Sequence, residues 1–174
     1  MRSLVGIFSL ALLIASPYGD ARMIPDPNQK PAPGNHEEQT PIHLANYSPL
    51  VNYNLQCRGC HLTDGEGTPR SDVPMMKGFL GHFLKVEGGR EFLAQVPGSS
   101  QSALTHQQLA ELLNWMLEDD GIAGGSTPKN FKEYTGEEIE LYRHVMIGDL
   151  VEHRKALIDS IRKLGIDIPV NVIP

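Results

Sequence analysis

The sequence predicts an all-α fold, and three observations support this prediction. Apolar residues recur every three or four positions in several segments, which is the spacing of one helix face. Residues suited to helix caps stand directly before these segments, and glycine or proline follows them. No segment alternates apolar and polar residues as a half-buried strand would. The 174 residues are enough for one domain with one core.

Residues 1–21 match an export signal. Arg2 supplies the positive start, and residues 4–15 form an uncharged apolar run, shorter than the roughly 20 residues that span a membrane. Small residues then suit cleavage after Ala21, with an uncleaved membrane anchor as the alternative. Residues 22–46 are rich in proline and lack apolar periodicity, which predicts an extended lead-in.

The predicted core covers residues 47–120 and begins with a short helix. Ser48 is a suitable cap for this helix, and Pro49 is a suitable first residue. Residues 62–86 are rich in glycine and proline, so we expect a loop there. This loop contains the apolar residues Phe79, Leu80, Phe83 and Leu84.

Two further helices are predicted in the second half of the core. A short one over 90–96 should end at Pro97. The longer one opens with a capping box formed by Thr105 and Gln108. Its apolar residues share one face: Leu109, Leu112, Leu113, Met116 and Leu117.

A helical extension over 130–168 follows the core. Thr135 with Glu138 opens its first helix, and Asp149 with Glu152 opens its second. The expected apolar faces contain Ile139, Tyr142, Val145 and Met146 in the first helix and Leu150, Leu157, Ile158, Ile161 and Leu164 in the second. We expect both helices to bury these faces by packing on the core, with a surface for a partner as the alternative.

Charge and cysteine usage narrow the class of protein. The net charge of −6 argues against nucleic acid and anionic membranes as partners and favours a basic patch on a protein partner. The chain has only two cysteines, three positions apart. A disulfide between them would close a very small loop and stabilise almost nothing, so they need another role.

Cys57-Arg58-Gly59-Cys60-His61 is the C-x-x-C-H pattern of c-type haem attachment. Thiols one helical turn apart can reach the two vinyl groups on one edge of a porphyrin, and the adjacent imidazole then binds iron. The pattern therefore predicts one covalent haem c with His61 as an axial ligand. A thioredoxin-like redox pair would need a βαβ context, and a structural zinc site would normally need four ligands.

Over about residues 48–118 the chain resembles the class I cytochromes c, in which a helix leads into this motif. Residues 74–78 stand where that family has a Pro-x-Leu-x-Gly segment, with Met76 in place of the leucine. The resemblance implies a cytochrome c-like fold around one haem. It also implies that the Pro74 carbonyl accepts the His61 ring N–H and that Met76 packs on the haem. Trp115 corresponds to the aromatic residue of the last core helix, which crosses the first.

The second axial ligand is not identified. Family members supply a methionine from the loop before the last core helix, but residues 96–104 contain none. Met146, His106 and Met75 are candidates, and an iron without a second protein ligand is the other possibility. Arg90 is a candidate partner for a haem propionate, since arginine pairs with carboxylates.

The resemblance implies a periplasmic monohaem one-electron carrier between a dehydrogenase and a downstream acceptor such as a terminal oxidase. On this interpretation the protein is not an enzyme, and it does not insert stably into the membrane unless the signal is uncleaved. The main alternative is a peroxidase-like enzyme or gas sensor with an open sixth iron site, motivated by the missing loop methionine. A haem subunit that holds a larger redox complex together is a third possibility.

Overall fold

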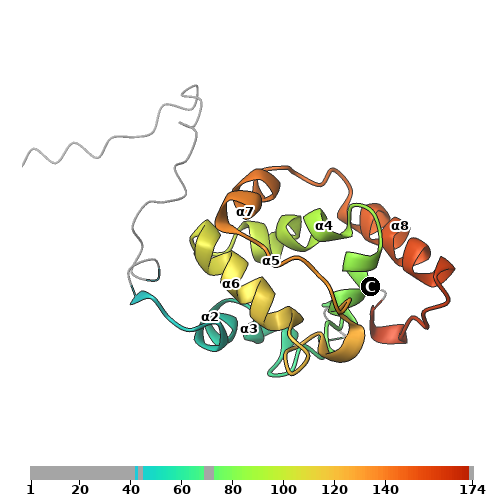
Figure 1. Cartoon of the computed structure of the whole chain (residues 1–174), viewed down its shortest axis with the longest axis horizontal. Helices are drawn as coiled ribbons and strands as arrows, with labels where there is room; N and C mark the ends of the chain where they lie inside the picture. The colour runs from blue at the N-terminus through green and yellow to red at the C-terminus, as the bar shows by residue number, and fades with distance from the viewer. Residues whose placement is uncertain (1–41, 43–44, 69–72, 173–174) are drawn as a thin grey trace, which may run out of the picture. The chain divides into compact units, whose positions relative to one another are not determined.

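The computed structural model describes residues 42, 45–68 and 73–172. The predicted export signal over 1–21 and nearly all of the lead-in over 22–46 lie outside these residues. The described part is all-α, as predicted (Figure 1). Its β structure is limited to one isolated bridge between Thr68 and Val73.

Helices and 3₁₀ turns follow one another along the described chain. They are α2 (Pro49–Gln56), α3 (Arg58–His61), η2 (Leu80–Lys85), α4 (Gly89–Gln95), α5 (Pro97–Ser100), α6 (His106–Leu117), η3 (Gly124–Ser126), α7 (Gly136–Arg143), α8 (Leu150–Lys163) and η4 (Val170–Val172). Within the described ranges, no helix combines the length and the apolar character needed to cross a bilayer.

Helix α6 forms the centre of the core. The predicted capping box is present: Thr105 accepts from the backbone of Gln108, whose side chain accepts from the backbone N–H of Thr105. All five residues of the predicted apolar face are buried. Helix α2 packs against α6, with the ring centroids of Tyr53 and Trp115 5.8 Å apart. This contact sets α2, and the motif that follows it, against the core.

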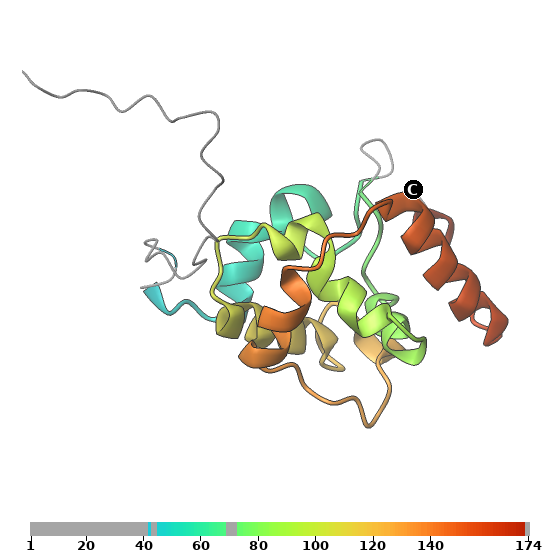
Figure 2. The same cartoon turned by 90° about the horizontal axis from the view of Figure 1, so that it is seen from above.

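The two predicted extension helices, α7 and α8, contact different parts of the core. Helix α7 packs on α4 and α6, and α8 contacts η2 (Figure 2). The side chains of the caps Thr135 and Asp149 accept hydrogen bonds from the backbone N–H groups of Glu138 and Glu152, as predicted. Ile139, Leu157, Ile158 and Ile161 are buried. Each helix therefore buries one stripe against a neighbouring element.

Several sequence-based expectations were wrong in detail. The expected loop over 62–86 contains the 3₁₀ helix η2, whose Leu80 and Phe83 are buried. Pro97 does end α4, but it also begins the short helix α5, because proline suits a first helical position. Helix α7 ends at Arg143, so Val145 and Met146 fall beyond it and are exposed. Leu164 is also exposed, at the end of α8.

Candidate functional site

The C-x-x-C-H segment adopts one tight helical turn after α2. Cys57 interrupts the helix with φ −119° and ψ −40°, and α3 begins at the next residue. The backbone N–H groups of Cys60 and His61 both donate to the Cys57 carbonyl oxygen, at 3.2 and 3.0 Å. This turn brings the two cysteines and the imidazole to the same end of α2. Both cysteines are free thiols.

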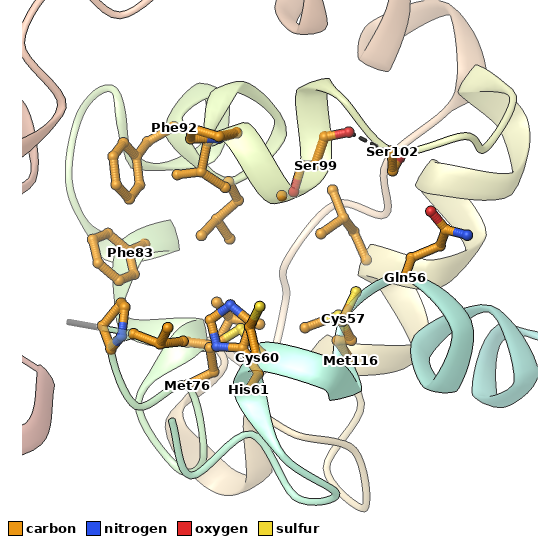
Figure 3. A pocket seen from close by; sticks show the side chains of 18 of the residues that line it. Gln56, Cys57, Cys60, His61, Met76, Phe83, Phe92, Ser99, Ser102 and Met116 are labelled. Carbon is orange, nitrogen blue, oxygen red and sulfur yellow. Dashed lines mark hydrogen bonds between the residues drawn. The ribbon is translucent and has the colours of Figure 1, made fainter. Parts of the chain in front are cut away.

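Cys57, Cys60 and His61 border a cavity of about 430 Å³ (Figure 3). This volume is within the range of about 300–1,000 Å³ that small-molecule and cofactor sites occupy. In Figure 3, Cys60, His61 and Met76 lie on one side of the cavity, and Phe92 and Ser99 lie on the other. Most of the remaining wall is apolar and comes from η2, α4, α6 and α8.

His61 is held in a form suited to binding a metal. Burial lowers its pKa, which favours the neutral imidazole at neutral pH; the Pro74 backbone opposes this shift as a nearby acceptor, and the Arg154 charge adds to it. No well-formed hydrogen bond reaches Nδ1, which is buried without a partner among the described residues. A buried, unpartnered ring nitrogen is uncommon in proteins and points to a missing ligand or a missing partner.

Cys57 does not have the properties of a reactive or zinc-binding thiol. Burial, together with the neighbouring Cys60, raises the pKa of Cys57 to about 11. Reactive cysteines instead have lowered pKa values. Among the described residues, no three His, Cys, Asp or Glu side chains are grouped so that they could hold a metal ion. Cys57 is therefore placed as a neutral side chain at the border of an apolar cavity.

These features fit a haem. The cavity offers apolar surface for a macrocycle, two free thiols one turn apart at its border, and an imidazole whose buried Nδ1 lacks a partner. Pro74 and Met76 line the same cavity. The structure thus brings five of the seven predicted cofactor-binding residues to one site.

The other two predicted residues, Arg90 and Trp115, do not line the cavity. The Arg90 guanidinium donates to both carboxylate oxygens of Glu138 at 2.7 Å and to the carbonyl oxygens of Lys132 and Glu133. Its donors are engaged within the protein, so the expected pairing of Arg90 with a propionate has no support in this geometry. The ring of Trp115 packs on that of Tyr53 instead.

Of the three candidates for the second axial ligand, one lines the cavity. Met75 lines the cavity. Met146 is 92% exposed and belongs to the linker between α7 and α8. His106 lies against His144, at a ring-centroid distance of 5.6 Å, and does not line the cavity. Met76 and Met116 are the other methionines at the cavity wall.

Sequence reasoning missed the cavity residues of α8, above all Arg154, as well as the paired rings of Phe83 and Phe92. The two rings stack with centroids 5.2 Å apart. Arg154 is buried and lines the cavity. The only local signal for Arg154 was its place three residues before Leu157 on the predicted apolar face of the last helix. That position predicts contact with the core but does not predict a cavity.

Comparison with known proteins gives two relatives of the same kind. The chain is 32% identical over 106 residues to cytochrome c-552 of Thermus thermophilus. The matched region covers 51% of this chain and 79% of that protein. It is also 32% identical over 106 residues to a second cytochrome c-552, from a strain of the same species. The matched region covers 70% of that second protein. No family model matches the chain. No solved structure matches it either.

Proposed function

The chain belongs to the c-type cytochromes, and from this premise we propose that it is a class I, monohaem, one-electron carrier that works in the periplasm. The observation that carries the proposal is the placement of Cys57, Cys60 and His61 at the border of one apolar cavity. The bound haem would supply one-electron chemistry by cycling between ferrous and ferric iron.

Each residue of the motif has a distinct role in this proposal. Cys57 and Cys60 hold the cofactor through thioether bonds, so it is retained outside the cytoplasm. His61 would bind the iron through a ring nitrogen, and burial lowers its pKa, which favours the neutral imidazole. Cys60 is exposed whereas Cys57 is half-buried, so the edge near Cys60 is the proposed route for electrons.

The apolar wall has an electrostatic role. Phe83, Phe92 and Leu113 limit the access of water to the cavity. Ferric haem carries one more positive charge than ferrous haem, so a dry, apolar environment favours the reduced form and raises the reduction potential. We therefore propose a potential set mainly by burial and by the identity of the second axial ligand.

The proposed partners are a periplasmic dehydrogenase as donor and a terminal oxidase or similar protein as acceptor. The net charge of −6 supports a basic docking surface on these partners. Electron-transfer encounters are usually small and short-lived, so association should weaken as the salt concentration rises.

A second candidate function is a haem enzyme or gas sensor with an open sixth iron site. One observation favours it: residues 96–99 and Ser102 line the cavity opposite His61 without supplying a methionine or histidine. Met75 is the candidate that would argue against it, because its thioether is at the cavity wall.

Absorption spectroscopy of the purified protein, with and without carbon monoxide, tests both functions. An electron carrier should show a low-spin reduced spectrum that carbon monoxide leaves unchanged. Rapid binding of carbon monoxide by high-spin iron would overturn the carrier function and support the open site. A Met75→Ala variant that gains carbon monoxide binding would identify Met75 as the ligand, with Met146→Ala as the matched exposed control.

A further inference from the structure

Arg154 of α8 is a buried cation at the cavity wall. Its side chain is held in place by the chain itself: Nε and Nη2 donate to the Val172 carbonyl oxygen at 3.3 and 3.0 Å. The guanidinium carbon lies 5.3 Å from the ring centroid of Phe83 and 5.9 Å from that of Phe92. Residue Arg154 is only 9% exposed. The guanidinium is therefore fixed before any ligand binds.

The charge of Arg154 lacks a counter-ion in the part of the chain that the structure describes. None of the ion pairs there includes Arg154. Burial lowers its pKa to about 10, so the side chain still carries its proton at neutral pH. A buried charge without a partner is costly, and a single carbonyl oxygen offsets only part of that cost. The site thus favours an anion.

We propose that Arg154 binds a carboxylate of the cavity's ligand, which is a propionate if the ligand is haem. This inference rests on the proposed function. Carboxylate is the anion that a guanidinium binds best, because two N–H groups can donate in parallel to its two oxygens. Arg154 takes the role that the sequence suggested for Arg90, whose donors are occupied by Glu138 and two carbonyl oxygens. The last helix of the chain then fixes the cofactor as well as covering it.

A fixed positive charge beside the haem also affects the iron. It opposes the additional positive charge of the ferric state and neutralises the carboxylate that would otherwise stabilise that state. Arg154 should therefore raise the reduction potential. The interaction is between buried groups, so solvent ions screen it little.

Spectroscopic redox titration of the haem-loaded protein tests this inference. Arg154→Gln removes the charge but keeps a donor for the Val172 carbonyl, and Arg154→Lys keeps the charge. Arg162→Gln is the matched control on the same helix, because Arg162 is exposed and pairs with Asp159. We expect Arg154→Gln to shift the reduction equilibrium about tenfold toward ferric iron, with Arg154→Lys and the control close to wild type.

A titration of the wild-type protein with acetate identifies the source of the carboxylate. If a propionate occupies Arg154, acetate leaves the potential unchanged at constant ionic strength. A saturable fall in potential would show that Arg154 is open to free anions, and this would overturn the inference. So would an Arg154→Gln potential equal to that of the control, or an Arg154→Lys potential as low as that of Arg154→Gln. A purified protein without haem would instead overturn the proposed function.

Discussion

The Tyr53 hydroxyl donates a hydrogen bond of 2.8 Å to the carbonyl oxygen of Leu62. Leu62 directly follows His61 and has a positive φ of 63°, a conformation that few residues other than glycine adopt. Tyr53 is completely buried, in the helix that precedes the motif. This bond links the helix before the C-x-x-C-H turn to the residue directly after it, and holds the sharp reversal of the chain after the imidazole.

Tyr53→Phe should reduce the free energy of unfolding by about 1 kcal/mol, because one partly buried acceptor loses its donor while the ring still packs on Trp115. Urea unfolding followed by circular dichroism measures this loss. Tyr47→Phe is the matched control, since Tyr47 is 43% exposed and only its backbone carbonyl oxygen accepts a bond from Asn52. Equal stability of the two variants would contradict the role given to the Tyr53 hydroxyl.

Gly89→Ala should destabilise the protein by about 2–3 kcal/mol, because a Cβ there would overlap the carbonyl group of Phe83. Relief of this overlap would also move the side chains of Phe83 and Phe92 at the cavity wall. Gly98→Ala is the control, since a Cβ at Gly98 meets no atom within 4 Å. Thermal unfolding of the two variants checks this prediction. Equal melting temperatures of the Gly89→Ala and Gly98→Ala proteins would contradict the close packing of η2 against α4.

Arg143→Met should cost about 3 kcal/mol and loosen one wall of the cavity, because the apolar replacement leaves buried acceptors without donors. The Arg143 guanidinium donates to the carbonyl oxygens of Ser100, Ser102 and Leu104, at distances of 2.9 Å to Ser100 and 2.7 Å to Leu104. Hydrogen exchange should speed up in residues 99–104 more than in α8. Uniform exchange across the chain would mean that Arg143 only adds stability and does not hold this segment.

The ion pair between Arg90 and Glu138 predicts a pH dependence of stability. The hydrogen bond from Arg90 holds the pKa of Glu138 below its ordinary value of 4.5. A carboxyl group with a lowered pKa in the folded state contributes stability above its unfolded pKa and loses that contribution as the pH falls through its folded pKa. Glu138→Gln should therefore be less stable than wild type at pH 7, and the difference should shrink steadily below about pH 4.5.

Urea unfolding from pH 7 to pH 3 measures this dependence. Glu140→Gln is the control on the same helix, because Glu140 is exposed. A stability difference between wild type and Glu138→Gln that stays constant over this range would contradict the account of the pair.

The elements that the sequence predicted well are those with local signals. The α6 cap depends on two residues three positions apart, and its apolar face depends on one helical period, so both can be recognised without a structure. The caps of α7 and α8 follow the same rule. The 3₁₀ helix η2 was missed because its short apolar repeat, Leu80, Phe83 and Leu84, lies among glycines. Its form depends on packing: Gly81 lies against Thr127, and α8 contacts η2.

The candidate site was predictable only in part, for the same reason. The motif residues are consecutive in the chain, and the spacing from His61 to Pro74 follows the pattern of a known family. Arg143 and Arg154 have no such signal. Arg143 binds carbonyl groups about 40 residues earlier in the chain, and Arg154 binds Val172 in the last turn. Arginine is usually exposed, so burial of either one could not be inferred from its neighbours in sequence.

Acid extraction of the denatured protein into organic solvent, followed by mass spectrometry of the polypeptide, tests the central claim most directly. If Cys57 and Cys60 anchor a haem, the colour stays with the polypeptide and the mass exceeds that of the chain by one haem, whereas a Cys57→Ser, Cys60→Ser protein lacks the added mass. A wild-type polypeptide without the added mass, or colour that passes into the organic phase, would contradict the account.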